Sequence, residues 1–82
     1  MTTQDLLEDI ITLAVDVTTD TPHDAFVEFS GHVMSATLYI HLGGWRPSKD
    51  ANIFLTTYIN EDYGIDDLKE MKSTLQDLLG QN

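Results

Sequence analysis

The chain has 82 residues, with 14 acidic side chains against four Lys and Arg, and a formal net charge of −10 at pH 7. This charge disfavours direct binding to nucleic acid or to an anionic membrane, because both ligands need a cationic surface. The length fits one domain, residues 1–82, and the absence of cysteine excludes disulfides and thiolate metal sites.

No basic, apolar leader opens the chain, and no apolar run reaches the ~18–20 residues that a membrane-spanning helix needs. We therefore expect a soluble protein of the cytoplasm.

Residues 3–17 predict an amphipathic helix. Its apolar residues recur at helical spacing and form a stripe, which is widened on one side: Leu6, Ile10, Leu13, Ala14 and Val17, then Leu7, Ile11 and Val15. Thr2 or Thr3 can cap the start, where Asp5 suits the positive end of the helix dipole. The run from Thr18 to Pro22 is expected to end the helix.

Residues 24–30 and 33–42 predict two strands of a hairpin with Gly31-His32 as a two-residue turn. This turn would pair Phe29 with Met34 and Val27 with Ala36. Alternate apolar residues of both strands then share one face, and a slip by one residue would destroy that agreement.

A loop at residues 43–51 leads to a third predicted strand at 52–60 and a second predicted helix at 65–79. Gly64 can stand at the N-cap of that helix, and Gly80 follows its last turn. The order α-β-β-β-α predicts an α+β fold, a three-stranded antiparallel meander with two helices packed on one face.

Two helices leave the other face of such a sheet open, and several aromatic residues fall on that face. Exposed aromatic patches of this kind mark interaction surfaces. The candidate partner-binding residues are Phe26, Tyr39, His41, Trp45, Phe54 and Tyr58. Alternatively, a helix or the Trp45 loop folds over this face. A separate alternative for Trp45 is that Gly43 and Gly44 bend the chain, so that its side chain closes one end of the core.

The residues give no sign of catalysis. His23, His32 and His41 do not converge in the predicted fold, and no serine has the G-x-S-x-G setting of a nucleophile. The acidic run that begins at Asn60 lacks the glycine and glutamate that a calcium-binding EF-hand loop requires. We expect no enzyme activity and no catalytic, cofactor-binding or metal-binding residues.

Two hypotheses for function follow. The first is a small acidic protein-binding module that acts through its aromatic sheet face, in a homodimer or with a protein partner of another kind. The second is an acidic mimic of nucleic acid that inhibits a DNA- or RNA-binding protein or a nuclease. Its acidic residues form two clusters, Asp5, Glu8, Asp9 and Asp16 on the first helix, and Glu61, Asp62, Asp66 and Asp67 before and in the second.

The segment from His23 to Trp45, with its Phe-Val-Glu-Phe-Ser-Gly-His-Val hairpin and Gly-Gly-Trp exit, resembles small acidic uncharacterised proteins of bacterial phages and prophages. The resemblance implies an accessory or inhibitory role through binding of host or phage proteins in the host cytoplasm. Some acidic phage proteins of this size inhibit nucleases by mimicking DNA. The resemblance supplies no functional residues.

Overall fold

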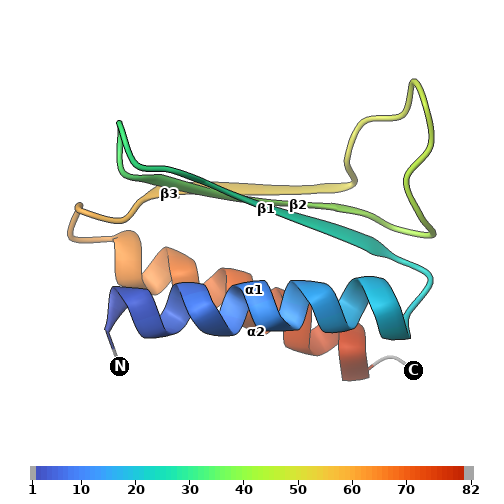
Figure 1. The fold of residues 1–82 in the computed structure, drawn as a ribbon, viewed down its shortest axis with the longest axis horizontal. Coiled ribbons are helices and arrows are strands. Elements are labelled where there is room, and N and C mark those ends of the chain that lie inside the picture. Colours follow the sequence, from blue (N-terminus) through green and yellow to red (C-terminus); the bar gives the residue numbers. More distant parts are fainter. Residues whose placement is uncertain (1, 81–82) are drawn as a thin grey trace.

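The structure, a computed structural model, describes residues 2–80. Its elements are α1 (Thr3–Asp20), β1 (Asp24–Ser30), β2 (Ser35–His41), β3 (Ile53–Tyr58) and α2 (Gly64–Gly80). The strands form one antiparallel sheet in the order β1-β2-β3, and Figure 1 shows both helices on the same side of it. The predicted α+β fold, a meander with two helices on one face, is confirmed.

The core lies between the helices and the central strand. Residues at helical spacing on α1 and α2 meet alternate residues of β2, and the buried set is Leu6, Ile10, Ala14, Val17, Ala36, Leu38, Ile40, Leu68, Met71, Leu75 and Leu78. On the edge strands, the inward residues Val27 and Leu55 are only partly buried. Within residues 2–80, no helix combines the length and the apolar character that a membrane crossing requires.

A capping box opens α1. The Thr2 hydroxyl accepts a hydrogen bond from the Asp5 N–H at 3.1 Å, and the Asp5 carboxylate accepts one from the Thr2 N–H at 3.0 Å. These bonds to Thr2 lower the pKa of Asp5. The N-cap is thus Thr2, one of the two predicted candidates.

The prediction that α1 ends near residue 17 is wrong, because the helix continues to Asp20. Hydroxyl groups of the threonine run donate back to carbonyls of the last two turns of the helix: Thr19 donates to the Val15 carbonyl at 2.9 Å, and Thr21 donates to the Val17 carbonyl at 2.6 Å. The threonines therefore finish the last turn instead of preventing it.

The predicted hairpin register is also wrong, by two residues. Ser30 pairs with Ser35, Phe29 with Ala36 and Val27 with Leu38, so residues 31–34 form a longer turn in which Met34 has a φ of 55°. The Met34 carbonyl accepts a hydrogen bond from the Ile59 N–H at 2.9 Å, which ties this residue to the end of β3. A shift by two keeps the side chains of β1 and β2 on their predicted faces, whereas Met34 leaves the strand for the turn.

The two helices run in the same direction, so their N-termini lie at the same end of the molecule (Figure 1). Lys72 of α2 forms an ion pair with Asp9 of α1 at 2.9 Å. The first turn of α2 is fastened to the sheet, because the buried Thr57 hydroxyl of β3 donates to the Asp67 carboxylate at 2.7 Å.

We predict that Thr57→Val lowers the free energy of unfolding by ~1–2 kcal/mol, since valine fills the same space but removes a hydrogen bond to a charged group. The adjacent Thr56 supplies a matched control, because its hydroxyl bonds to that of Thr37 on the exposed face. Thr56→Val should change the free energy by less than ~0.5 kcal/mol. Urea unfolding of both variants checks this, and equal effects would contradict the role given to Asp67.

Candidate functional site

An aromatic row crosses the sheet face that the helices leave open. Phe26, Tyr39 and Phe54 are direct cross-strand neighbours. The ring centroids of Phe26 and Tyr39 are 4.9 Å apart with nearly parallel planes, and those of Tyr39 and Phe54 are 6.4 Å apart. The predicted register had placed Phe26 opposite Thr37, so the sequence indicated the aromatic face but not this row.

The segment 42–52 rises from the sheet on the side away from the helices (Figure 1). It begins with a tight turn in which Gly43 and Gly44 have φ of 80° and 107°, values that favour glycine. Two side chains from the start of the hairpin hold this turn. His23 Nδ1 accepts from the Gly43 N–H at 2.9 Å, and the Asp24 carboxylate accepts from the Trp45 N–H at 2.7 Å.

His41 lies on the outer face as predicted, but it is buried, with 6% of its surface exposed. Its ring meets those of Phe26 and Tyr39 edge to face, at centroid distances of 5.7 and 6.4 Å. His41 therefore supports the aromatic row from beneath segment 42–52 and presents little surface to a partner.

Trp45 is 56% exposed, so the alternative in which it closes the core is wrong. Its side chain lies on the outer side of the sheet and shares a hollow with Tyr39 and Phe54. The expected neighbour Tyr58 is 49% exposed on the same face and pairs with Ser35 toward the hairpin turn.

The loop hollow, as we name it, has a volume of about 560 Å³ between the sheet and segment 42–52. Aromatic rings and charged groups line it together: Tyr39, His41, Trp45 and Phe54, with Glu28, Lys49, Asp50 and Ala51. Glu28, Lys49 and Asp50 were not predicted. Lys49 and Asp50 lie in a loop whose path depends on His23 and Asp24, and no local pattern reveals that dependence.

The Tyr39 hydroxyl donates a hydrogen bond to Glu28 Oε1 at 3.3 Å. Burial, the charge of Glu28 and this hydrogen bond together raise the pKa of Tyr39 above its ordinary value of 10.0. Because the pKa is raised in the folded state, the stability due to the neutral phenol is fully present below pH 10.0. It is lost as the pH rises through the folded-state pKa.

We predict that an ultraviolet titration places the Tyr39 midpoint above 10.0, and that Glu28→Gln moves it down toward that value because the charge is gone. The difference between wild type and Tyr39→Phe isolates this residue from Tyr58 and Tyr63. A midpoint that Glu28→Gln leaves unmoved would contradict the contact.

The fold brings most acidic residues of the second hypothesis to the end of the molecule where both helices begin (Figure 1), whereas Asp16 lies near the other end of α1. Several have structural partners, however. Asp5 caps α1, Asp9 pairs with Lys72, and Asp67 accepts from Thr57.

The remaining candidates of that set differ in exposure. Glu8 accepts a hydrogen bond from the Gln4 side chain at 3.3 Å, and Asp16 is half-buried. Glu61, Asp62 and Asp66 are exposed. In the part of the chain that the structure describes, no group of three or more His, Asp or Glu side chains is placed to hold a metal ion.

The chain was compared with known proteins, and no family model, curated protein or solved structure matches it.

Proposed function

We propose that this protein is a binding module for another protein, and that the loop hollow receives a cationic side chain of the partner. The observation that carries the proposal is the joint lining of one hollow by the rings of Tyr39, Trp45 and Phe54 and the carboxylates of Glu28 and Asp50. Aromatic faces attract Lys and Arg through cation–π contact, and carboxylates pair with the same groups.

The charge of the whole chain favours the same kind of partner. With a net charge of −10, the protein attracts basic surfaces over a distance set by the ionic strength. Lys49 is the one cation among the lining residues of the hollow. Lys49 lies on the loop next to Asp50, so its charge is offset there. On the sheet side of the hollow, the charged lining residue is Glu28.

Exposure shows which residues can supply binding energy. Phe54 is 65% exposed and Trp45 56%, although both are apolar, so a partner would remove a large apolar area from water on contact. Central aromatic residues of this kind tend to dominate interfaces, at ~2 kcal/mol or more each.

Self-association through this face is less favourable than binding of a basic partner. Two copies would bring Glu28 and Asp50 of one protomer toward the same acids of the other, and both copies carry a charge of −10. The accessory role that the phage-protein resemblance implies agrees with a binding function of this kind.

The test begins with capture of partners from the native host and continues with the purified partner. We predict that Phe54→Ala and Trp45→Ala each weaken binding ~30-fold. Both variants should melt close to the wild-type temperature, because these side chains lie outside the core. Ile65→Ser, which changes an exposed apolar residue at the start of α2, is the control and should bind like the wild type.

Salt distinguishes this proposal from acidic mimicry of nucleic acid. Mimicry rests on exposed charges, so binding should fall steeply with salt and depend on Glu61, Asp62 and Asp66. Binding in the loop hollow should depend on Phe54 at low and at high salt. A partner that binds Phe54→Ala as tightly as the wild type contradicts the proposal.

A further inference from the structure

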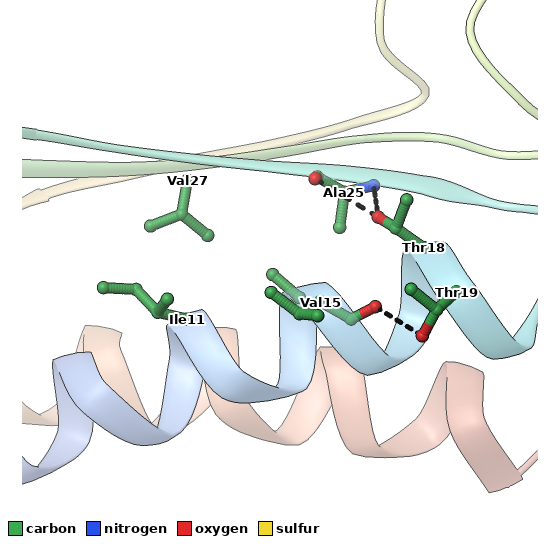
Figure 2. A pocket seen from close by; sticks show the side chains of 7 residues that line it. Ile11, Val15, Thr18, Thr19, Ala25 and Val27 are labelled. Carbon is green, nitrogen blue, oxygen red and sulfur yellow. Dashed lines mark hydrogen bonds between the residues drawn. The ribbon is translucent and has the colours of Figure 1, made fainter.

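β1 is an edge strand, and its backbone shows which groups face outward. The Ile40 carbonyl of β2 points toward the β3 side, where it accepts a hydrogen bond from the Asn52 N–H at 2.9 Å. Ala25 pairs with Ile40, so the backbone groups of Ala25 point away from β2. Figure 2 shows where they go: the Ala25 N–H donates to the Thr18 hydroxyl at 3.0 Å, and that hydroxyl donates to the Ala25 carbonyl at 3.5 Å.

The same alternation applies further along β1. Pairing runs without interruption from Asp24 to Ser30, so Val27 and Phe29 also direct their N–H and C=O groups outward. Among residues 2–80, no strand lies on that side of β1. The Thr18 hydroxyl bonds to the backbone N–H and C=O of Ala25. The backbone groups of Val27 and Phe29 lie at the edge of the sheet, where they can pair with an added strand.

Exposed apolar side chains of α1 lie beside this edge, on the helix side of the sheet. Ile11 and Val15 of α1 are 51% and 56% exposed, and with Ala25 and Val27 they line a hollow of about 410 Å³ (Figure 2). A second hollow of about 410 Å³ lies toward the hairpin turn, where Leu7 of α1 and Phe29 of β1 line it together with Met34 of the turn and Ile59, which follows β3.

We call the two hollows together the edge groove. From Thr3 to Thr19, α1 rises ~24 Å, which matches an extended segment of about seven residues.

A second copy of this chain does not fit the edge groove. Pairing of two β1 strands would put them ~4.8 Å apart. Since α1 packs directly on β1, the two α1 helices would come to a similar spacing, although packed helices need ~8–10 Å. A single extended segment meets no such obstacle, because it brings no helix with it.

We propose that the edge groove binds an extended segment of a partner protein, which pairs antiparallel with β1 as a fourth strand. In this pairing, the residues that exchange hydrogen bonds with Val27 and Phe29 place their side chains on the same face as these two. That face is toward Ile11 and Val15 (Figure 2), so apolar side chains suit those positions.

The alternate residues of the added strand point to the outer face of the sheet. Their neighbours on β1 there are Phe26 and Glu28, a ring and an exposed carboxylate. Basic side chains suit these positions, through ion pairing with Glu28 and contact with the ring of Phe26. The ligand class is therefore an extended segment in which apolar and basic residues alternate.

The test uses a synthetic peptide of about seven residues in which valine alternates with lysine. Hydrogen exchange followed by NMR should show the amides of Val27 and Phe29 slowed ~10-fold or more in the saturated complex. Unchanged exchange at both amides with bound peptide would overturn the proposal.

Two methylated peptides test the direction of the backbone bonds. Methylation of the valine nitrogens removes the N–H groups that face β1, and affinity should fall ~10-fold or more. Methylation of the lysine nitrogens, which face away, should change it little. Equal affinity of the two peptides, or a loss of affinity only when the lysine nitrogens are methylated, would overturn the proposed antiparallel pairing with β1.

Substitutions on α1 test whether the exposed apolar side chains of this helix contact the bound peptide. Ile11→Gln and Val15→Gln should each weaken peptide binding ~5-fold or more without loss of folding, because both side chains are exposed. Thr12→Gln, on a neighbouring position of the helix that lines a different hollow, should not. Phe54→Ala should also leave peptide binding unchanged, so the edge groove and the loop hollow can fail independently. Loss of binding in Thr12→Gln equal to that in Ile11→Gln would overturn the assignment.

Discussion

Replacement of Leu38 by alanine is expected to remove most of the stability of this protein. Leu38 is fully buried at the centre of β2, between Val27 and Leu55 of the neighbouring strands and above both helices. A Leu→Ala change in such a place costs ~3–5 kcal/mol, since transfer energy is lost and a cavity remains.

A domain of this size has a total of roughly 4–12 kcal/mol of stability, so Leu38→Ala should be largely unfolded at 37 °C or melt far below the wild type. Calorimetry measures this directly. Leu42→Ala is the matched control: it removes the same atoms from a leucine that is 44% exposed just past β2, and it should cost less than ~1 kcal/mol. Similar losses in both variants would contradict the placement of the core.

The second large effect is expected at Gly64, the first residue of α2. A Cβ there would lie 2.8 Å from the Tyr58 carbonyl oxygen and 3.0 Å from the Ile59 Cα. Both atoms belong to the backbone where β3 ends, so they can move only if α2 shifts on the sheet. Overpacking of this kind costs ~1–3 kcal/mol, and it would also disturb the Thr57 to Asp67 hydrogen bond.

We predict that Gly64→Ala lowers the free energy of unfolding by ~3 kcal/mol in urea titration. Gly31→Ala provides the comparison, because its nearest atom is a Phe29 side-chain carbon at 3.8 Å, an ordinary contact. That variant should stay within ~0.5 kcal/mol of the wild type. A neutral Gly64→Ala would contradict the close approach of α2 to the end of β3.

Periodicity alone was enough to predict the order of the elements and the residues that each element turns toward the core. Leu6, Ile10 and Val17 repeat at the spacing of a helix, while Ala36, Leu38 and Ile40 alternate as in a strand. These are local signals, and the residues that show them are buried in the core of the folded protein. The hairpin register could not be fixed in this way, because turns of two and of four residues leave Val27 on the same face.

The loop hollow depends on contacts that are distant in sequence. Segment 42–52 takes its path because His23 and Asp24 accept hydrogen bonds from Gly43 and Trp45, some twenty residues later. No spacing rule connects these residues. Exposed aromatic residues could therefore be predicted, but their gathering with Glu28 and Asp50 around one hollow could not.

The helix end shows the opposite case, in which a local signal was misread. The run from Thr18 to Pro22 predicts an end to the helix after Val17, because threonines can compete with helical hydrogen bonds and Pro22 restricts the residue before it. In the structure, Thr19 and Thr21 donate to carbonyls of the last turns, and the Thr18 hydroxyl accepts a hydrogen bond from the Ala25 N–H of β1. The same hydroxyl chemistry can end a helix or complete it, and the tertiary contacts decide which.

The central claim is that the outer sheet face under segment 42–52 is the surface that meets a partner. Trp45 is the single tryptophan of the chain and lines the loop hollow, so its fluorescence reports on this surface alone. We predict that acrylamide quenches Trp45 readily in the free protein, where the side chain is 56% exposed, and much less in the presence of saturating partner. Quenching that stays at the level of the free protein when the partner is bound would contradict the account.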